Sequence, residues 1–424
     1  KRKLATLEGN AQQVTLISFH PEGELVASAG WEGVVRIWEP GSRRQVIKLP
    51  FGVQVGFSKG GRWLGVAWED GVRAQLLEAV PSRQYHTFAP RPSRAETILY
   101  EGAISERDGI LALGMNDGVH FFDLVAHREA GRITLGTTLS VHFQKHGEEL
   151  ITCGPASGLQ RWTIERAANG FKVRLAHRSP LPSTPMRAVS RSGGTVLAVV
   201  SEESNQARLI DLEDDAVSEK SLDHDGISVA ALSPDGRFVA TAGWHSSQVR
   251  LWETRTSALL HEWSFRGPMN VFFTPKSDEL IICRDAAFDF VNLSTLAIQR
   301  TVARELEVYP GTVSFTADGT LMAMELSPGV LHLKEVATGR TLAKLEDPYG
   351  DRATWTGFTA GGSQLVVAAR YAGVIHLWDL RALREKLKPM GLDWNWPEFP
   401  ASRSGPKPAI GSEIYFDVSS ETTR

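Results

Sequence analysis

The stretch SAGWEGVVRIWEP, residues 28–40, decides the fold of this chain. It consists of a small-residue turn and a short apolar run that ends in Trp and is followed by an acid. The same pattern returns as TAGWHSSQVRLWE at 241–253 and as AARYAGVIHLWD at 368–379. Three near-copies so far apart in one chain indicate an internal repeat.

Weaker copies of this strand end fill the intervals at a regular spacing. The residues that follow the apolar runs are Glu39, Glu78, Asp123, Thr163, Asp211, Glu253, Asn292, Glu335 and Asp379. From Glu39 to Asp379 there are 340 residues in eight steps, a mean of 42.5, and single steps stay between 39 and 48. A period of this length is typical of four-stranded propeller blades.

A second landmark, a tight hairpin, precedes each strand end by about 20 residues. The clearest examples are FHPEG (19–23), LSPDG (232–236), FTADG (315–319) and FTAGG (358–362). Gly supplies the positive φ that such loops need. The runs that follow, such as RFVATAG (237–243), are almost continuously apolar, as in strands covered on both faces. The whole pattern predicts an all-β protein.

We therefore expect a single closed β-propeller of nine four-stranded blades over residues 1–380. The ninth repeat lacks a fourth strand, and KLATL (3–7) resembles the outer strand TLAKL (341–345). The N-terminal strand should complete the last blade and leave no exposed sheet edge. Two smaller rings are the alternative, and they would need a linker or a second closing strand in mid-chain.

Residues 381–424 should form a short helix and an aromatic tail that pack on the propeller, with the end of the chain partly disordered. Leu380, Leu383 and Leu387 share one helix face, and Pro389 stops the helix. The apolar side chains of the tail are Trp394, Trp396 and Phe399. We expect them to dock on the propeller, or alternatively to be offered to a partner.

Composition excludes several function classes. The 46 basic and 49 acidic residues nearly cancel, which argues against a nucleic-acid partner. No apolar run is long enough to span a membrane, so we expect no membrane insertion and a cytoplasmic location. Only Cys153 and Cys283 are present, as buried thiols in our interpretation, and the 12 His show no metal-binding spacing. We expect no metal and no cofactor.

These repeats resemble the tryptophan-aspartate (WD) repeat family of β-propellers, most clearly in the first, sixth and ninth copies. In that family a His, a Ser or Thr, an Asp and the Trp form a hydrogen-bonded set within a blade. In the first repeat Ser28 and Trp38 match, while Asn10 replaces the His and Glu32 the Asp.

In the sixth repeat His224, Thr241 and Trp252 match the set, but the turn GWHSS (243–247) has no Asp. The tail at 377–400, LWDLRALREKLKPMGLDWNWPEFP, is similar to segments that end WD-repeat regions in multidomain bacterial proteins, many of which carry a serine/threonine kinase. This chain has no kinase signature. The resemblance implies a recognition module of a larger bacterial signalling protein, with any kinase outside these residues.

Five residues are candidates for partner binding. Trp31, Trp244 and Tyr371 lie in turns between the second and third strands of their repeats, so they should point toward one face, with Trp68 and Arg370 near the same level. Aromatic and Arg side chains dominate binding hot spots. The alternative is that these rings simply pack over their neighbours.

The predicted function is a non-catalytic scaffold, not an enzyme, that acts as a monomer and binds a protein or peptide through its face loops. One alternative is a propeller enzyme with its active site in the central channel. Such enzymes need converging acids, His or Arg on inner strands, and the inner stretches VTLISF (14–19) and GTVSF (311–315) are mainly apolar or small. A second alternative is a structural spacer.

Overall fold

A computed structural model of the protein describes residues 6–7, 9–10, 12–21, 23, 25–40, 44–49, 51–68, 70–78, 84–88, 90, 97–105, 109–167, 170–178, 187–190, 196–201, 205–212, 217–305, 309–347, 350–371, 373–399 and 415–419. The chain forms two compact units, 1–89 and 90–424, and we describe the strand at residues 85–88 with the second unit because it belongs to that unit's last sheet. Nearly all regular structure in the described residues is strand, which confirms the all-β prediction. No helix there is long and apolar enough to cross a membrane.

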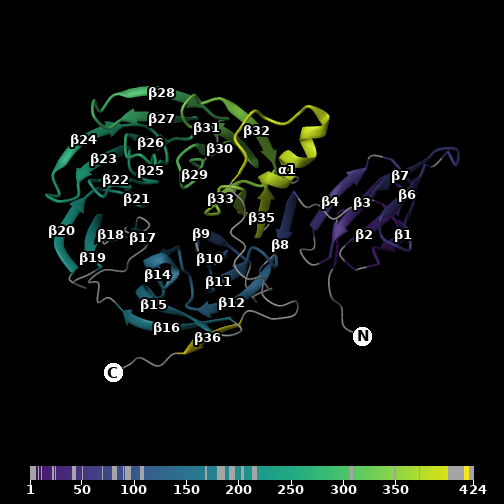
Figure 1. Ribbon diagram of the computed structural model, residues 1–424, viewed down its shortest axis with the longest axis horizontal. Coiled ribbons are helices and arrows are strands. Elements are labelled where there is room, and N and C mark those ends of the chain that lie inside the picture. Colours follow the sequence, from purple (N-terminus) through teal and green to yellow (C-terminus); the bar gives the residue numbers. More distant parts are fainter. Residues whose placement is uncertain are drawn as a thin grey trace. The chain divides into compact units, whose positions relative to one another are not determined.

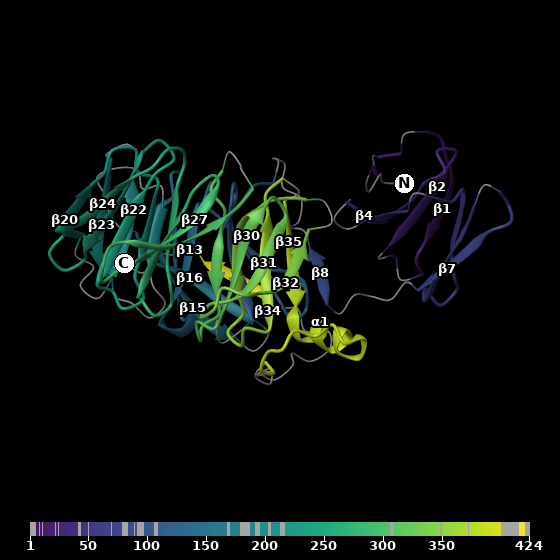
Figure 2. The same cartoon turned by 90° about the horizontal axis from the view of Figure 1, so that it is seen from above.

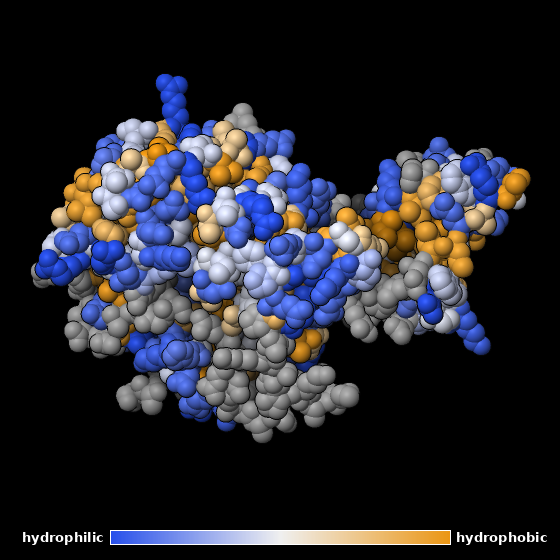
Figure 3. Space-filling model, turned by 45° about the horizontal axis from the view of Figure 1, so that its top comes forward, coloured by the Kyte–Doolittle hydropathy of each residue, from blue (hydrophilic) through white to orange (hydrophobic). Residues whose placement is uncertain are grey.

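The first unit contains two antiparallel sheets. Their strands, in sheet order, are β1 (Val14–Phe19), β2 (Val26–Gly30), β3 (Val35–Glu39) and β4 (Arg44–Leu49), followed by β5 (Gln54–Phe57), β6 (Trp63–Ala67) and β7 (Ala74–Glu78). Ala27 and Ile37 of the first sheet pack with Leu64 and Val66 of the second. β1 is largely exposed, and Figure 3 shows apolar surface on this unit.

The second unit repeats one motif, an antiparallel sheet of four consecutive strands. Its sheets, in strand order, are β9 (Leu99–Ile104), β10 (Ile110–Met115), β11 (Gly118–Asp123) and β12 (Arg128–Thr134); β13 (Ser140–Gln144), β14 (Glu149–Gly154), β15 (Gly158–Ala167), β16 (Gly170–Arg178) and β36 (Tyr415–Ser419); β17 (Arg187–Ser190), β18 (Val196–Ser201), β19 (Gln206–Asp211) and β20 (Val217–Asp223); β21 (Val229–Leu232), β22 (Phe238–Ala242), β23 (Gln248–Glu253) and β24 (Leu259–Ser264); β25 (Asn270–Phe273), β26 (Glu279–Cys283), β27 (Ala287–Asn292) and β28 (Ile298–Ala303); β29 (Val313–Phe315), β30 (Leu321–Ser327), β31 (Val330–Glu335) and β32 (Thr341–Glu346); and β33 (Ala353–Phe358), β34 (Gln364–Ala369) and β35 (Val374–Asp379) with β8 (Tyr85–Phe88).

Within this unit the sheets follow one another around a common centre. Figure 1 shows the first strand of each sheet near the middle and the fourth strand outside. β9 contacts β13, β13 contacts β17, and β33 at the end of the series contacts β9 again. Apolar side chains fill the spaces between neighbours, as where Phe288 and Phe290 pack against Met322 and Met324. Each sheet is covered by its neighbours, which explains why the second and third strands are apolar on both faces.

Two features correct the expected nine-sheet ring. In such a ring β33 would pack beside β1, and a strand from residues 3–7 would lie beside β35. Instead β33 contacts β9, and the strand beside β35 is β8. Residues 1–5 lie outside the described part, and Thr6 and Leu7 are not in a strand. By position β8 is the fourth strand of the second repeat, yet it lies beside β35 in the last sheet and adds no extra residues to the chain. The even spacing of the repeats therefore concealed it.

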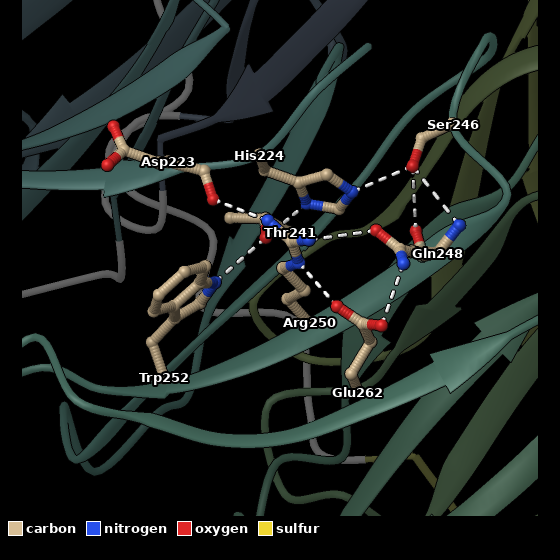
Figure 4. A network of polar contacts seen from close by, with 8 residues as sticks. All are labelled: Asp223, His224, Thr241, Ser246, Gln248, Arg250, Trp252 and Glu262. Atoms are coloured by element: carbon tan, nitrogen blue, oxygen red, sulfur yellow. Dashed lines mark hydrogen bonds and ion pairs between the residues drawn. The ribbon is translucent and has the colours of Figure 1, made fainter.

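A polar network ties together the sheet of β21–β24, as Figure 4 shows. His224 Nδ1 lies 2.7 Å from Thr241 Oγ1, and Trp252 Nε1 donates to the same oxygen at 2.9 Å. His224 Nε2 lies 2.8 Å from Ser246 Oγ. Ser246 thus takes the place in which the sequence pattern lacks an Asp. Burial, with a smaller effect of nearby Arg250, lowers the pKa of His224 to about 4.

The first sheet has a different hydrogen-bond network at the equivalent positions. Trp38 Nε1 donates to Ser28 Oγ at 2.8 Å, as the resemblance implies. Asn10 and Glu32 are joined through Arg36, whose Nη1 donates to Asn10 Oδ1 at 3.1 Å and whose Nη2 donates to Glu32 Oε2 at 3.1 Å. A buried guanidinium therefore lies where the family pattern has a His–Asp contact.

The segment after the last sheet packs on that sheet. α1 (Leu380–Leu387) begins at Asp379, whose side chain accepts from Ala382 N, and η2 (Lys388–Met390) follows it. Figure 2 shows α1 beside the last strands, and it contacts β34. Trp394 is buried in the same apolar cluster as Leu380 and Leu365, while Trp396 and Phe399 are partly buried there. Residues 400–414 and 420–424 lie outside the described part.

Candidate functional site

The candidate site lies at one edge of the second unit, which we call the loop edge. In an antiparallel four-stranded sheet, the turn between the second and third strands lies at the same end as the connection from the fourth strand to the next sheet. Trp244 is in the turn between β22 and β23, and Arg370 and Tyr371 are in the turn between β34 and β35. Tyr309 and Arg352 are in connections between sheets. All five therefore belong to the loop edge.

Tyr309 is the centre of this group. The Trp244 ring centroid lies 5.2 Å from that of Tyr309, with the two planes inclined at 58°. The guanidinium of Arg352 lies 4.3 Å from the Tyr309 centroid and that of Arg370 lies 5.3 Å from it. We call Trp244, Tyr309, Arg352 and Arg370 the loop-edge cluster. It joins side chains from four separate connections.

Backbone contacts hold the members of the cluster in place. Trp244 N donates to Ser228 Oγ at 3.0 Å, and Arg370 N donates to the carbonyl of Arg352 at 2.9 Å. Tyr371 N donates to both carboxylate oxygens of Asp351, at 3.1 and 3.0 Å, while 70% of the Tyr371 side chain is exposed. The site is therefore a fixed surface with one projecting ring beside it.

A buried polar layer lies in the sequence segments that carry Tyr309 and Arg352. Arg304 Nη1 donates to the carbonyls of Arg284, Asp285 and Tyr309 at 3.3, 3.1 and 2.8 Å. Glu325, only 1% exposed, accepts from Ala353 N at 2.7 Å. Burial raises the pKa of the Glu325 carboxyl. These bonds anchor the residues on either side of the cluster.

Gly311 is required by the close packing of this layer. A Cβ at this position would lie 2.9 Å from the carbonyl oxygen of Glu325, 2.9 Å from Phe288 Cζ and 3.1 Å from Arg304 Nε. The two backbone segments approach more closely than any side chain allows. The thiol of Cys283 donates to the Gly311 carbonyl at 3.1 Å, and burial raises its pKa.

The other two predicted residues belong to the first unit. Trp31 is 64% exposed, and its N donates to the carbonyl of Gln13 at 3.2 Å. Trp68 stacks on Phe51, with centroids 4.6 Å apart, and the Arg73 guanidinium lies 4.0 Å from its ring. Trp68 thus packs on Phe51 and Arg73, whereas Trp244 and Arg370 meet at Tyr309. Whether Trp31 and Trp68 contribute to binding stays a prediction.

The sequence reasoning missed Tyr309 and Arg352 because it considered only turns within repeats. The connections between repeats lie at the same edge. The aromatic-Pro-Gly sequence at 309–311 is a signal that could have identified Tyr309. Arg352 follows an Asp in the corresponding connection of the next repeat. Counting both kinds of loop would have brought these residues together.

Charged side chains also occur on the first strands, which the sequence analysis took to be mainly apolar. Arg187 of β17 forms an ion pair with Glu101 of β9. His142 of β13 lies between them in the series of strands, and its Nε2 is 2.6 Å from the carbonyl of Ala188. Burial lowers the pKa of His142, an effect that Glu101 opposes. In this group the acid and the imidazole both have partners. No set of three or more His, Cys, Asp or Glu in the described residues could hold a metal ion.

Comparison with known proteins agrees with the repeat pattern. The model of the WD domain, G-beta repeat family matches residues 1–39 and 217–253. A chromatin assembly factor 1 subunit of Saccharomyces cerevisiae is 25% identical over 212 residues, which cover 46% of this chain and 45% of that protein. The chain spans less than half the length of that relative. These matches confirm the resemblance of the repeats to WD repeats, while the likeness of the tail at 377–400 stays a prediction.

Proposed function

We propose that the protein is a non-catalytic interaction module that binds a segment of a partner protein at the loop edge of its second unit. The observation that carries the proposal is the meeting of Trp244, Arg352 and Arg370 at the ring of Tyr309. Side chains from four connections converge there without forming a packed core. Aromatic and Arg residues of this kind dominate the energies of protein interfaces.

The module we infer is a closed ring of seven four-stranded blades, running from β8 to β35. Support comes from the contact of β33 with β9 and from the place of β8 beside β35. A closed ring holds the loops of successive blades at fixed separations, because each sheet is packed between two others. Such a frame keeps the loop-edge cluster preorganised for a partner.

The wider setting is also part of the proposal. WD repeats suggest protein partners, and the yeast relative is named as a subunit of an assembly factor, which implies work within a complex. The likeness of residues 377–400 to the ends of WD-repeat regions in kinase-type bacterial proteins favours a recognition role within a larger signalling protein.

Site-specific photocrosslinking in the native cells tests the binding edge. A benzophenone amino acid replaces Tyr371, beside the loop-edge cluster, and in a matched control it replaces Val125, which is 66% exposed in the turn between β11 and β12. That turn joins a third strand to a fourth and so lies at the opposite edge. We expect a protein adduct from position 371 and none from position 125.

Adducts of equal yield at both positions would contradict the assigned edge. Absence of an adduct at 371, with the fold intact by circular dichroism, would favour the spacer alternative. Loss of the adduct on Trp244→Ala would tie the captured partner to the cluster itself.

A further inference from the structure

The loop-edge cluster concentrates positive charge. Two guanidiniums, those of Arg352 and Arg370, lie within 5.3 Å of the centroid of the single Tyr309 ring. Like charges in partly buried positions repel each other unless an anion lies nearby. The ring attracts each cation, but the attraction of an aromatic face does not neutralise the charge of Arg370.

The acids of the same segments have other roles. Asp351 holds Tyr371 N with both of its oxygens. Glu325 is buried and accepts from Ala353 N, and burial raises the pKa of its carboxyl, an effect that Arg352 and Arg304 oppose. Within the described residues no carboxylate lies within ion-pair distance of Arg370, although Arg250, Arg284 and Arg300 in the same unit each have an acidic partner.

The arrangement of the two Arg suits an oxyanion. The side chain of Arg352 is anchored, because its Nη2 donates to the Pro310 carbonyl at 3.4 Å. Among the described residues Arg370 is held only by its backbone and by the Tyr309 ring, which leaves its five N–H donors available to a ligand. Guanidiniums bind carboxylates and phosphates with paired hydrogen bonds. Trp244 and Tyr309 add flat apolar surface beside this charge.

From this geometry we propose, building on the proposed function, that the loop-edge cluster selects partner segments by an acidic side chain. Its oxyanion pairs with Arg370, and the neighbouring residues of the segment pack on Trp244 and Tyr309. A carboxylate of Asp or Glu and the phosphate of a phosphorylated Ser share the chemistry that this site recognises. A partner segment with only neutral side chains leaves the charge of Arg370 unpaired.

A peptide library tests this selection on the full chain. The probe is a set of 12-residue synthetic peptides with random flanks and a central Glu, Gln, phosphoserine or Ser, incubated with the immobilised protein at low salt. We expect central Glu or phosphoserine to be retained about tenfold over Gln and Ser. The ratio between Glu and phosphoserine distinguishes the two sources of the oxyanion.

Three variants locate the effect. Arg370→Met should abolish the preference for the acidic centre, and Arg370→Lys should keep part of it because the charge remains. Arg255→Met is the matched control, since Arg255 is an exposed Arg in the turn between β23 and β24 at the opposite edge. It should leave the preference unchanged.

The outcomes separate this inference from the proposed function. If the protein retains peptides whatever their central residue, and Trp244→Ala abolishes this retention, the acidic selection is overturned but the binding edge stands. An acidic preference that survives Arg370→Met also overturns it. Failure of every peptide to bind overturns it as well, and photocrosslinking at position 371 then decides the proposed function independently.

Discussion

At the scale of single residues, His224 shows how a buried imidazole couples stability to pH. Its ring lies between Thr241 and Ser246, neither of which carries a charge, and burial lowers its pKa to about 4. The folded state therefore favours the neutral ring. Its stabilising effect is fully present above the unfolded pKa near 6.5 and is lost as the pH falls toward 4.

We expect the free energy of unfolding to fall by about 3 kcal/mol between pH 7 and pH 4 on account of this residue. Urea denaturation across this range measures it. The comparison protein is His224→Gln, which should be less stable at pH 7 and should show a smaller dependence on pH. Other buried imidazoles contribute equally to both proteins. An identical pH dependence in the two would show that His224 is not the source.

The hydrogen-bonded set was predictable residue by residue only where the repeat kept its pattern. His224, Thr241 and Trp252 were identified from spacing, and they bond as expected. Arg36 was not identified, because a charged residue in the middle of a strand is usually interpreted as facing solvent. Arg36 is buried because its guanidinium pairs with Glu32. From the sequence, Glu32 was identified only as the residue that replaces the family's Asp.

At the scale of elements, the connection before β29 depends on a residue without a side chain. Gly311→Ala would place a methyl group against Phe288, Arg304 and the Glu325 carbonyl. We expect a loss of about 2 kcal/mol in stability and a weakened loop-edge cluster, since the segment that carries Tyr309 must move. Thermal denaturation measures the first effect.

The matched control is Gly361→Ala. Gly361 does not have a positive φ, and a Cβ there would have only Ser363 Oγ, at 4.0 Å, as a neighbour. It should change stability by less than about 0.5 kcal/mol. Equal effects of the two substitutions would refute the packing argument for Gly311.

The C-terminal segment depends on one side chain of α1. Arg384 donates to Asp393 Oδ1 at 2.8 Å and to the carbonyls of Trp396 and Pro397, each at 2.7 Å. Arg384→Met should release residues 391–399 from the last sheet and raise the rate of proteolytic cleavage there about tenfold. Lys386→Met, on the exposed side of the same helix, should leave the rate unchanged. Mass spectrometry of limited digests locates the cuts.

At the scale of the whole molecule, the sequence predicted the repeat unit but not which strand completes the last sheet. Nine repeats were counted, and in the described part of the chain the strands form nine sheets. Position in the sequence assigns β8 to the second repeat, yet it pairs beside β35. Hydrophobic pattern cannot distinguish these two places, because an outer fourth strand has the same composition in either sheet.

Deletion of residues at the N-terminus distinguishes the two arrangements. A chain beginning at Gln84 keeps β8 and should retain a cooperative thermal transition within a few degrees of that of the second unit in the full chain. A chain beginning at Pro90 lacks β8 and exposes the edge of β35, so its transition should fall by about 5 °C or more. Calorimetry measures both transitions.

If all nine sheets formed one ring, removal of residues 1–83 would take two blades from it, and the chain beginning at Gln84 would lose its transition altogether. Because the two chains differ by only six residues, a difference between them isolates the contribution of β8.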